Sequence, residues 1–127
     1  MTSVILADDE EFVRYFLRTI MDSLSFDVVA EVEKGDKLIG VMREQQPDIL
    51  LLDINMPNLT GVEFLKEYSS EFPKTCIIVL TSATSVKLLD EASITATKCF
   101  LSNDTPPEKM ITSIQDAWTQ FSEEQNV

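Results

Sequence analysis

The sequence predicts an α/β domain in which a parallel sheet lies between two layers of helices. Short apolar runs alternate along the chain with stretches whose apolar residues recur every three or four positions, the helical period. The runs are continuously apolar, which is typical of strands covered on both faces. The clearest is Ile-Leu-Leu-Leu at 49–52, which ends abruptly on Asp53. A chain of 127 residues with 44% hydrophobic residues fits one domain over residues 1–127, without internal repeat or linker.

Five strands and five helices can be assigned in chain order. The expected strands are 3–7, 26–32, 49–53, 75–80 and 97–101. The expected helices are about 12–24, 36–46, 61–72 and 86–93, with a last one that starts at Pro106-Pro107 and continues through Phe121. Proline in a first helical turn is favourable because its missing N–H has no partner there in any case.

Turn-forming residues mark several element ends. Asp36, in the turn Lys34-Gly35-Asp36, is the expected N-cap of the second helix, and Gln46-Pro47 closes that helix. Pro57 and Gly61 prevent the third strand from continuing beyond Asp53.

The apolar positions of two helices indicate which faces are buried. In the third helix Val62, Leu65 and Tyr68 share one face. In the last helix Trp118 and Phe121 continue an apolar stripe, so we expect them in the core or at its edge rather than at a partner contact.

Alternation of this kind predicts a flavodoxin-like doubly wound sheet with strand order 2-1-3-4-5. Ligands of such sheets bind outside the carboxyl ends of the strands, where the order reverses. Asp8 and Asp9 follow the first strand and Asp53 ends the third, so these carboxylates should converge, joined by Thr81 and Asn103. Crowded carboxylates repel one another, and oxygen ligands of this kind suit Mg²⁺.

Charge and cysteine usage exclude several classes. A formal charge of −12 with scattered Lys and Arg argues against a nucleic-acid surface. The N-terminal residues have no basic leader and no membrane-spanning run, so we expect a cytoplasmic protein that does not bind a membrane. Cys76 and Cys99 lie in apolar runs without metal-ligand spacing, and the chain has no His; buried free thiols are expected.

The motifs match a known family over essentially the whole chain. They are Asp8-Asp9 closing the first strand, Asp53 closing the third with Met56-Pro57 and Gly61 after it, Thr81 closing the fourth, and Phe100-Leu101 with Asp104-Thr-Pro-Pro107 around the fifth. The chain resembles a response-regulator receiver domain, the CheY-like module of two-component phosphorelay signal transduction.

That resemblance implies a chemistry for the acids. Asp53 would be the phosphoacceptor, receiving a phosphoryl group from a histidine kinase or phosphotransfer protein. Asp9, Asp53 and the main-chain carbonyl of Asn55 would bind Mg²⁺, with Asp8 acting mainly through water. Such a domain is a phosphoprotein that assists its own phosphorylation rather than an enzyme.

The resemblance also implies a conformational switch, with one departure. Thr81 would be the switch hydroxyl and Phe100 the aromatic switch residue. The family places a lysine three residues after that aromatic, and this chain has Asn103 there. A neutral amide forms weaker hydrogen bonds than an ammonium group, which predicts weakened coupling. Lys98 is not expected to reach the pocket.

Three alternatives stay open. The domain could be an atypical receiver that signals through protein contacts without phosphorylation. It could be a phosphohydrolase of the haloacid dehalogenase type, although such enzymes need a second Asp where this chain has Asn55. A flavodoxin is disfavoured because the acidic loop after the first strand would repel the cofactor phosphate. In a receiver, the face of helix four, strand five and helix five often carries an output domain or a homodimer contact.

Overall fold

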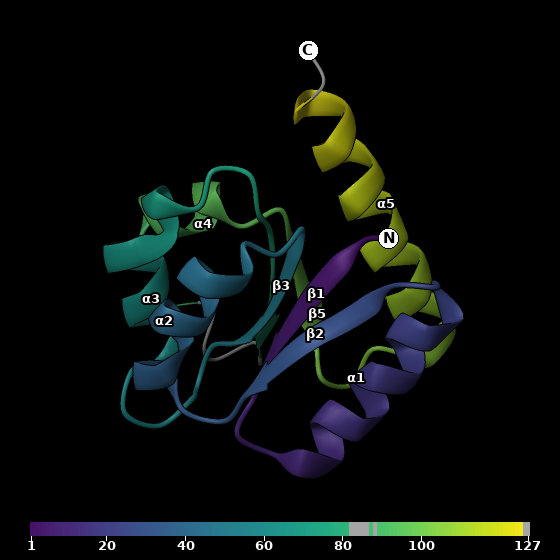
Figure 1. The fold of residues 1–127 in the computed structure, drawn as a ribbon, viewed down its shortest axis with the longest axis horizontal. Helices are drawn as coiled ribbons and strands as arrows, with labels where there is room; N and C mark the ends of the chain where they lie inside the picture. The colour runs from purple at the N-terminus through teal and green to yellow at the C-terminus, as the bar shows by residue number, and fades with distance from the viewer. Residues whose placement is uncertain (82–86, 88, 126–127) are drawn as a thin grey trace.

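The computed structural model describes residues 1–81, 87 and 89–125, and it contains one five-stranded sheet (Figure 1). All strand pairs are parallel and the order is β2-β1-β3-β4-β5. The strands are β1 (Ser3–Ala7), β2 (Asp27–Val32), β3 (Ile49–Asp53), β4 (Cys76–Thr81) and β5 (Cys99–Ser102). The helices are α1 (Glu11–Ser23), α2 (Gly35–Gln45), α3 (Gly61–Tyr68), α4 (Glu91–Ala96) and α5 (Pro107–Gln125), with a short 3₁₀ turn, η1 (Ser69–Glu71). The predicted flavodoxin-like fold is confirmed.

The helices form two layers, with α1 and α5 on one face of the sheet and α2, α3 and α4 on the other (Figure 1). Because successive strand side chains point to opposite faces, β1 and β3 each supply both cores. Val4, Leu6 and Leu51 lie in the core under α1 and α5, whereas Leu50 and Leu52 lie in the core under α2 and α3. This double burial explains why the strands are continuously apolar.

The start of α2 differs from expectation. The N-cap is Lys34, which makes no capping side-chain hydrogen bond, and Asp36 lies within the first turn; the predicted Asp36 cap was wrong. Gly35 explains the difference, because its main-chain N–H donates to the Pro57 carbonyl oxygen at 3.0 Å. A Cβ atom at Gly35 would lie 1.7 Å from the Leu59 carbonyl oxygen. A tertiary contact between two loops therefore sets this helix start.

The buried face of α3 was only partly predicted. Phe64 and Leu65 are buried, whereas Val62 and Tyr68 are half-buried. Phe64 stacks against Phe72, with ring centroids 6.2 Å apart. The α-helix ends at Tyr68, earlier than expected, and η1 completes the connection to Phe72.

The region around α4 shows a second difference. The expected start at Val86 lies outside the described residues. In the described part, α4 begins after Asp90, whose carboxylate accepts a hydrogen bond from the Ser93 N–H at 2.8 Å, and it continues to Ala96. The predicted end at Ser93 was therefore wrong, and β5 starts two residues later than expected, at Cys99.

Several smaller expectations can be compared with the packing. Cys76 is buried and Cys99 half-buried, and both are free. Burial raises the pKa of the Cys76 thiol to about 12, so this thiol stays protonated. Trp118 packs at the edge of the core beside the buried Phe121, as expected. Among the described residues, no helix has the length and apolarity needed to cross a bilayer.

Candidate functional site

Three carboxylates meet at the carboxyl ends of β1 and β3. One oxygen from each of Asp8, Asp9 and Asp53 lies within 4.8 Å of the others. The strand register explains this, because β1 pairs directly with β3 and Ala7 is opposite Leu52. The convergence expected from strand order is therefore present in the structure.

The local backbone holds two of these side chains. The Asp8 carboxylate accepts a hydrogen bond from the Glu10 N–H at 2.8 Å, and the Asp53 carboxylate accepts one from the Asn55 N–H at 3.0 Å. Asp8 is buried, Asp53 is half-buried and Asp9 is exposed. The group thus forms a shallow cluster that opens to solvent on the side of Asp9.

Burial and mutual repulsion make this cluster costly when every member is ionised. The pKa of Asp8 rises from 3.8 to about 6, mainly because of burial, and the charges of Asp53 and Asp9 add to this effect. The pKa of Asp53 is also raised by burial, with a further contribution from Asp9. A hard divalent cation relieves such repulsion, and clustered carboxylate oxygens are the donors that Mg²⁺ prefers. The donor set fits this ion.

Gly61 lets the β3–α3 loop fold back onto Asp53. A Cβ atom there would lie 2.6 Å from the Ile54 Cα and 2.7 Å from the Asp53 carbonyl oxygen. The Gly61 N–H donates to the Ile54 carbonyl oxygen at 2.9 Å, which closes the loop beside the cluster. Lack of space, rather than an unusual backbone angle, requires glycine here.

Thr81 and Phe100 lie on the adjoining strands. Thr81 is buried at the end of β4, one residue beyond Leu80, which pairs with Asp53. Phe100 is half-buried on β5 and packs against the core under α2 and α3. The remaining hydroxyl residues predicted after Thr81, at 82–85, lie outside the described residues.

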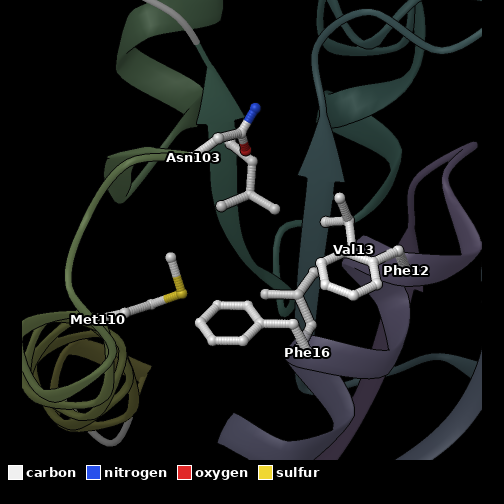
Figure 2. Close-up of a pocket in the computed structure, with 7 residues that line it drawn as sticks. Phe12, Val13, Phe16, Asn103 and Met110 are labelled. Carbon is white, nitrogen blue, oxygen red and sulfur yellow. The ribbon is translucent and has the colours of Figure 1, made fainter.

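Asn103 is exposed after β5 and borders an apolar pocket of about 240 Å³ between α1 and α5 (Figure 2). The other lining residues are Phe12, Val13, Phe16, Leu17, Leu80 and Met110. Lys98 precedes β5, and its ammonium pairs with the Glu124 carboxylate at 2.8 Å. As expected, Lys98 does not substitute for a cation at Asn103.

A family model described as the response regulator receiver domain matches residues 4–115 of this chain. The chain belongs to this family. The "uncharacterized transcriptional regulatory protein YhcZ" of Bacillus subtilis is 33% identical over 113 residues, which are 88% of this receiver domain and 53% of that protein. Thus the chain spans about half the length of the first regulators that it matches.

A chemotaxis relative and a solved structure agree with the assignment to the receiver-domain family. The chemotaxis protein CheY of Thermotoga maritima is 27% identical over 111 residues, or 87% of this chain and 92% of that protein. The receiver domain of AraT, a response regulator from Geobacillus stearothermophilus, superposes with a TM-score of 0.83 at 24% identity, covering 98% of both chains. The latter similarity supports the fold.

The structural roles of two residues at this edge of the receiver domain were not identified from the sequence. Arg14 is a buried cation, and Gly35 carries the close loop contact described above. A signal for Arg14 existed, since it occupies the same helical stripe as the buried Leu17 and Met21. An arginine in a buried stripe needs acceptors, and those come from other elements. No comparable local signal distinguishes Gly35 from Gly40.

Proposed function

We propose that this receiver domain accepts a phosphoryl group on Asp53 from a histidine kinase or phosphotransfer protein. The observation that carries the proposal is the convergence of Asp8, Asp9 and Asp53 within 4.8 Å, beside Thr81 at the end of β4. Asp9, Asp53 and the main-chain carbonyl of Asn55 would hold Mg²⁺, and Asp8 would act mainly through water. Signalling of this kind takes place in the cytoplasm.

Asp53 is suited to be the nucleophile. The Asn55 N–H donates to one carboxylate oxygen at 3.0 Å, and the second carboxylate oxygen would form the bond to phosphorus. The bond between phosphorus and the donor imidazole nitrogen breaks, and an acyl phosphate remains on Asp53. When bound, Mg²⁺ would offset negative charge on the phosphoryl oxygens. The domain assists this transfer without being an enzyme that turns over substrate.

The response to phosphorylation would use the adjoining strands. The Thr81 hydroxyl would donate a hydrogen bond to the new phosphoryl oxygens, and Phe100 would repack into the space vacated by Thr81. That change would reach an output domain or a second copy through the face formed by α4, β5 and α5. Asn103 would contribute a neutral amide to the phosphoryl group.

Intact mass spectrometry after incubation with acetyl phosphate and Mg²⁺ tests the assignment. The parent is expected to gain one phosphoryl group, and chelation of Mg²⁺ should prevent the gain. Asp53→Asn should gain none, whereas Asp22→Asn, which changes an exposed acid on α1, should match the parent. Phosphorylation of Asp53→Asn to the parental extent would refute Asp53 as acceptor.

Asn103 favours one second candidate, a receiver that signals through protein contacts without phosphorylation. The neutral side chain removes the cation with which the family holds the phosphoryl group. This candidate predicts that the parent gains no phosphoryl group from acetyl phosphate or from a phosphorylated kinase, although it still binds its output partner.

A further inference from the structure

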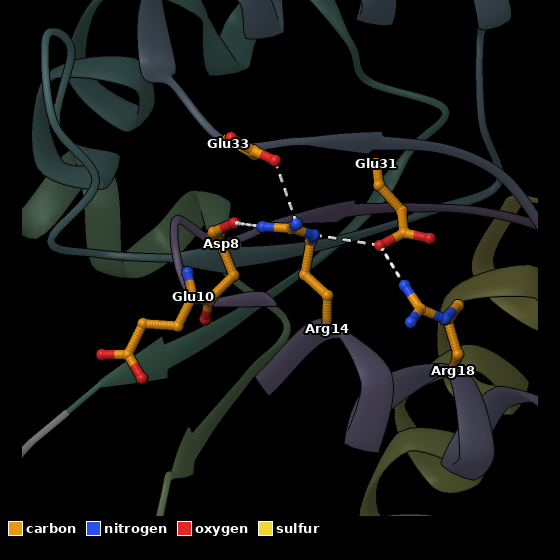
Figure 3. A network of polar contacts seen from close by, with 6 residues as sticks. All are labelled: Asp8, Glu10, Arg14, Arg18, Glu31 and Glu33. Carbon is orange, nitrogen blue, oxygen red and sulfur yellow. Dashed lines mark hydrogen bonds and ion pairs between the residues drawn. The ribbon is translucent and has the colours of Figure 1, made fainter. Parts of the chain in front are cut away.

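A buried arginine contacts the backbone that carries the acidic cluster. The side chain of Arg14, on α1, is 7% exposed. Its guanidinium donates to the Asp8 main-chain carbonyl oxygen at 2.7 Å, to the Glu31 carboxylate at 3.0 Å and to the Glu33 carboxylate at 3.1 Å (Figure 3). Three donors of the planar fork thus reach three acceptors on two chain segments.

The contact with Asp8 has a geometric consequence. The Asp8 carbonyl belongs to the peptide group that joins Asp8 to Asp9, and this group is planar. A hydrogen bond to its oxygen therefore restrains the orientation of the whole peptide, including the Cα from which the Asp9 side chain projects. Glu31, on β2, and Glu33, just after it, hold the other side of the guanidinium.

We infer that Arg14 is a positioning residue that orients the Asp8–Asp9 peptide for Mg²⁺ binding, an inference that rests on the proposed function. It acts by geometry and does not itself touch the ion. Groups that support metal ligands in this way commonly change metal affinity roughly tenfold or more when they are removed.

Whether the Mg²⁺ affinity falls or rises when the arginine is replaced distinguishes a positioning role from a purely electrostatic one. A cation near the acidic cluster repels Mg²⁺, so its removal would by itself strengthen the binding of Mg²⁺. Loss of a positioning contact weakens it. Arg14→Met should therefore bind Mg²⁺ roughly tenfold more weakly than the parent, against the electrostatic trend.

Arg18 provides a matched control. It lies one turn further along α1, and its guanidinium also pairs with Glu31, but it lies over the Tyr15 ring rather than against the Asp8 carbonyl (Figure 3). Arg18→Met removes the same charge from the same helix and the same partner. Its Mg²⁺ affinity should equal or exceed that of the parent.

The dissociation constant for Mg²⁺ is measured by titration followed through amide NMR shifts of the loop after β1, with melting temperature recorded separately. A purely structural role would lower the melting temperature of Arg14→Met without changing its Mg²⁺ affinity. If the parent binds Mg²⁺ and Arg14→Met binds it within twofold of the parent or more tightly, the positioning role is refuted and the proposed function stands. If the parent does not bind Mg²⁺, the metal part of the proposed function fails first, and the positioning role fails with it.

A second pair of variants, Arg14→Lys and Arg18→Lys, keeps the positive charge and tests the positioning role if Arg14→Met does not fold. Lysine at position 14 can donate to the Asp8 carbonyl oxygen but cannot span Glu31 and Glu33 at the same time. Arg14→Lys should bind Mg²⁺ more weakly than Arg18→Lys and, where both fold, more tightly than Arg14→Met. Equal affinities of the two lysine variants would overturn the inference.

Discussion

The two halves of the carboxyl edge of the sheet differ in charge and in how they are held. At β1 and β3, Asp8, Asp9 and Asp53 crowd together, and close backbone contacts at Gly35 and Gly61 brace the neighbouring loops. At β4 and β5 the corresponding residues, Thr81 and Asn103, are neutral, and Asn103 borders an apolar pocket.

This difference indicates that the two halves have different roles in the proposed function. The acidic half is held by backbone hydrogen bonds and destabilised by its own charge, and under the proposed function it would bind a cation and a phosphoryl group. The neutral half can supply hydrogen bonds but no fixed positive charge from Asn103. Under the proposed function, phosphoryl capture would depend on the acidic half and the conformational response on the neutral half, and three variants probe the two halves separately.

The largest effect is expected at Gly35, which braces the acidic half. In Gly35→Ala the Cβ would meet the Leu59 carbonyl oxygen at 1.7 Å, so a backbone must move. We expect a loss of about 3 kcal/mol or more in the free energy of unfolding, measured by urea denaturation.

Gly40 is the control for that variant. It is an exposed glycine of the same helix, and a Cβ there would meet no atom within 4 Å. Gly40→Ala should be neutral or stabilising by up to about 1 kcal/mol. If the two variants were equally stable, the loop contact at Gly35 would not brace the site.

A smaller effect is expected from charge relief within the acidic half. The pKa of Asp8 is raised to about 6, so between pH 4 and 6 the folded protein keeps a proton that the unfolded chain has lost. The free energy of unfolding should therefore fall as pH rises through this window. Metal-free Asp8→Asn avoids the penalty and should be more stable than the parent by roughly 2 kcal/mol at pH 7.

Denaturation of parent and Asp8→Asn from pH 4 to 7 without metal measures this difference. The two proteins should have similar stability near pH 4, and the gap should open toward pH 7. A constant gap across the range would show that charge on Asp8 is not its cause.

The smallest expected effect lies in the neutral half. Asn103→Lys restores the cation, and charge-assisted hydrogen bonds exceed neutral ones by about 1–2 kcal/mol, or roughly five- to thirtyfold in the ratio of active to inactive conformers. The NMR shifts of Thr81 and Phe100 caused by beryllofluoride should become larger. Thr112→Lys adds the same charge at an exposed position of α5 and should not enlarge them. A complete shift already in the parent would mean that another group compensates for Asn103.

Much of the fold could be predicted because its signals are local. The apolar run at 49–52 is continuous since both sheet faces are covered, and Gln46-Pro47 ends α2 because Gln46 adopts a left-handed backbone angle, φ 47°. The end of α4 was mispredicted, since Asp90 caps a helix whose weak apolar pattern does not define its bounds.

The sequence by itself determined that Asp8, Asp9 and Asp53 would meet, because strand order and the common direction of parallel strands bring their carboxyl ends together. Only the tertiary structure decided how this cluster is supported. Arg14 donates to acceptors just after β1, on β2 and just after β2, and Gly35 lies against a carbonyl group 24 residues further along the chain. Such contacts depend on how elements far apart in the sequence pack against one another, and local residue patterns do not specify that packing.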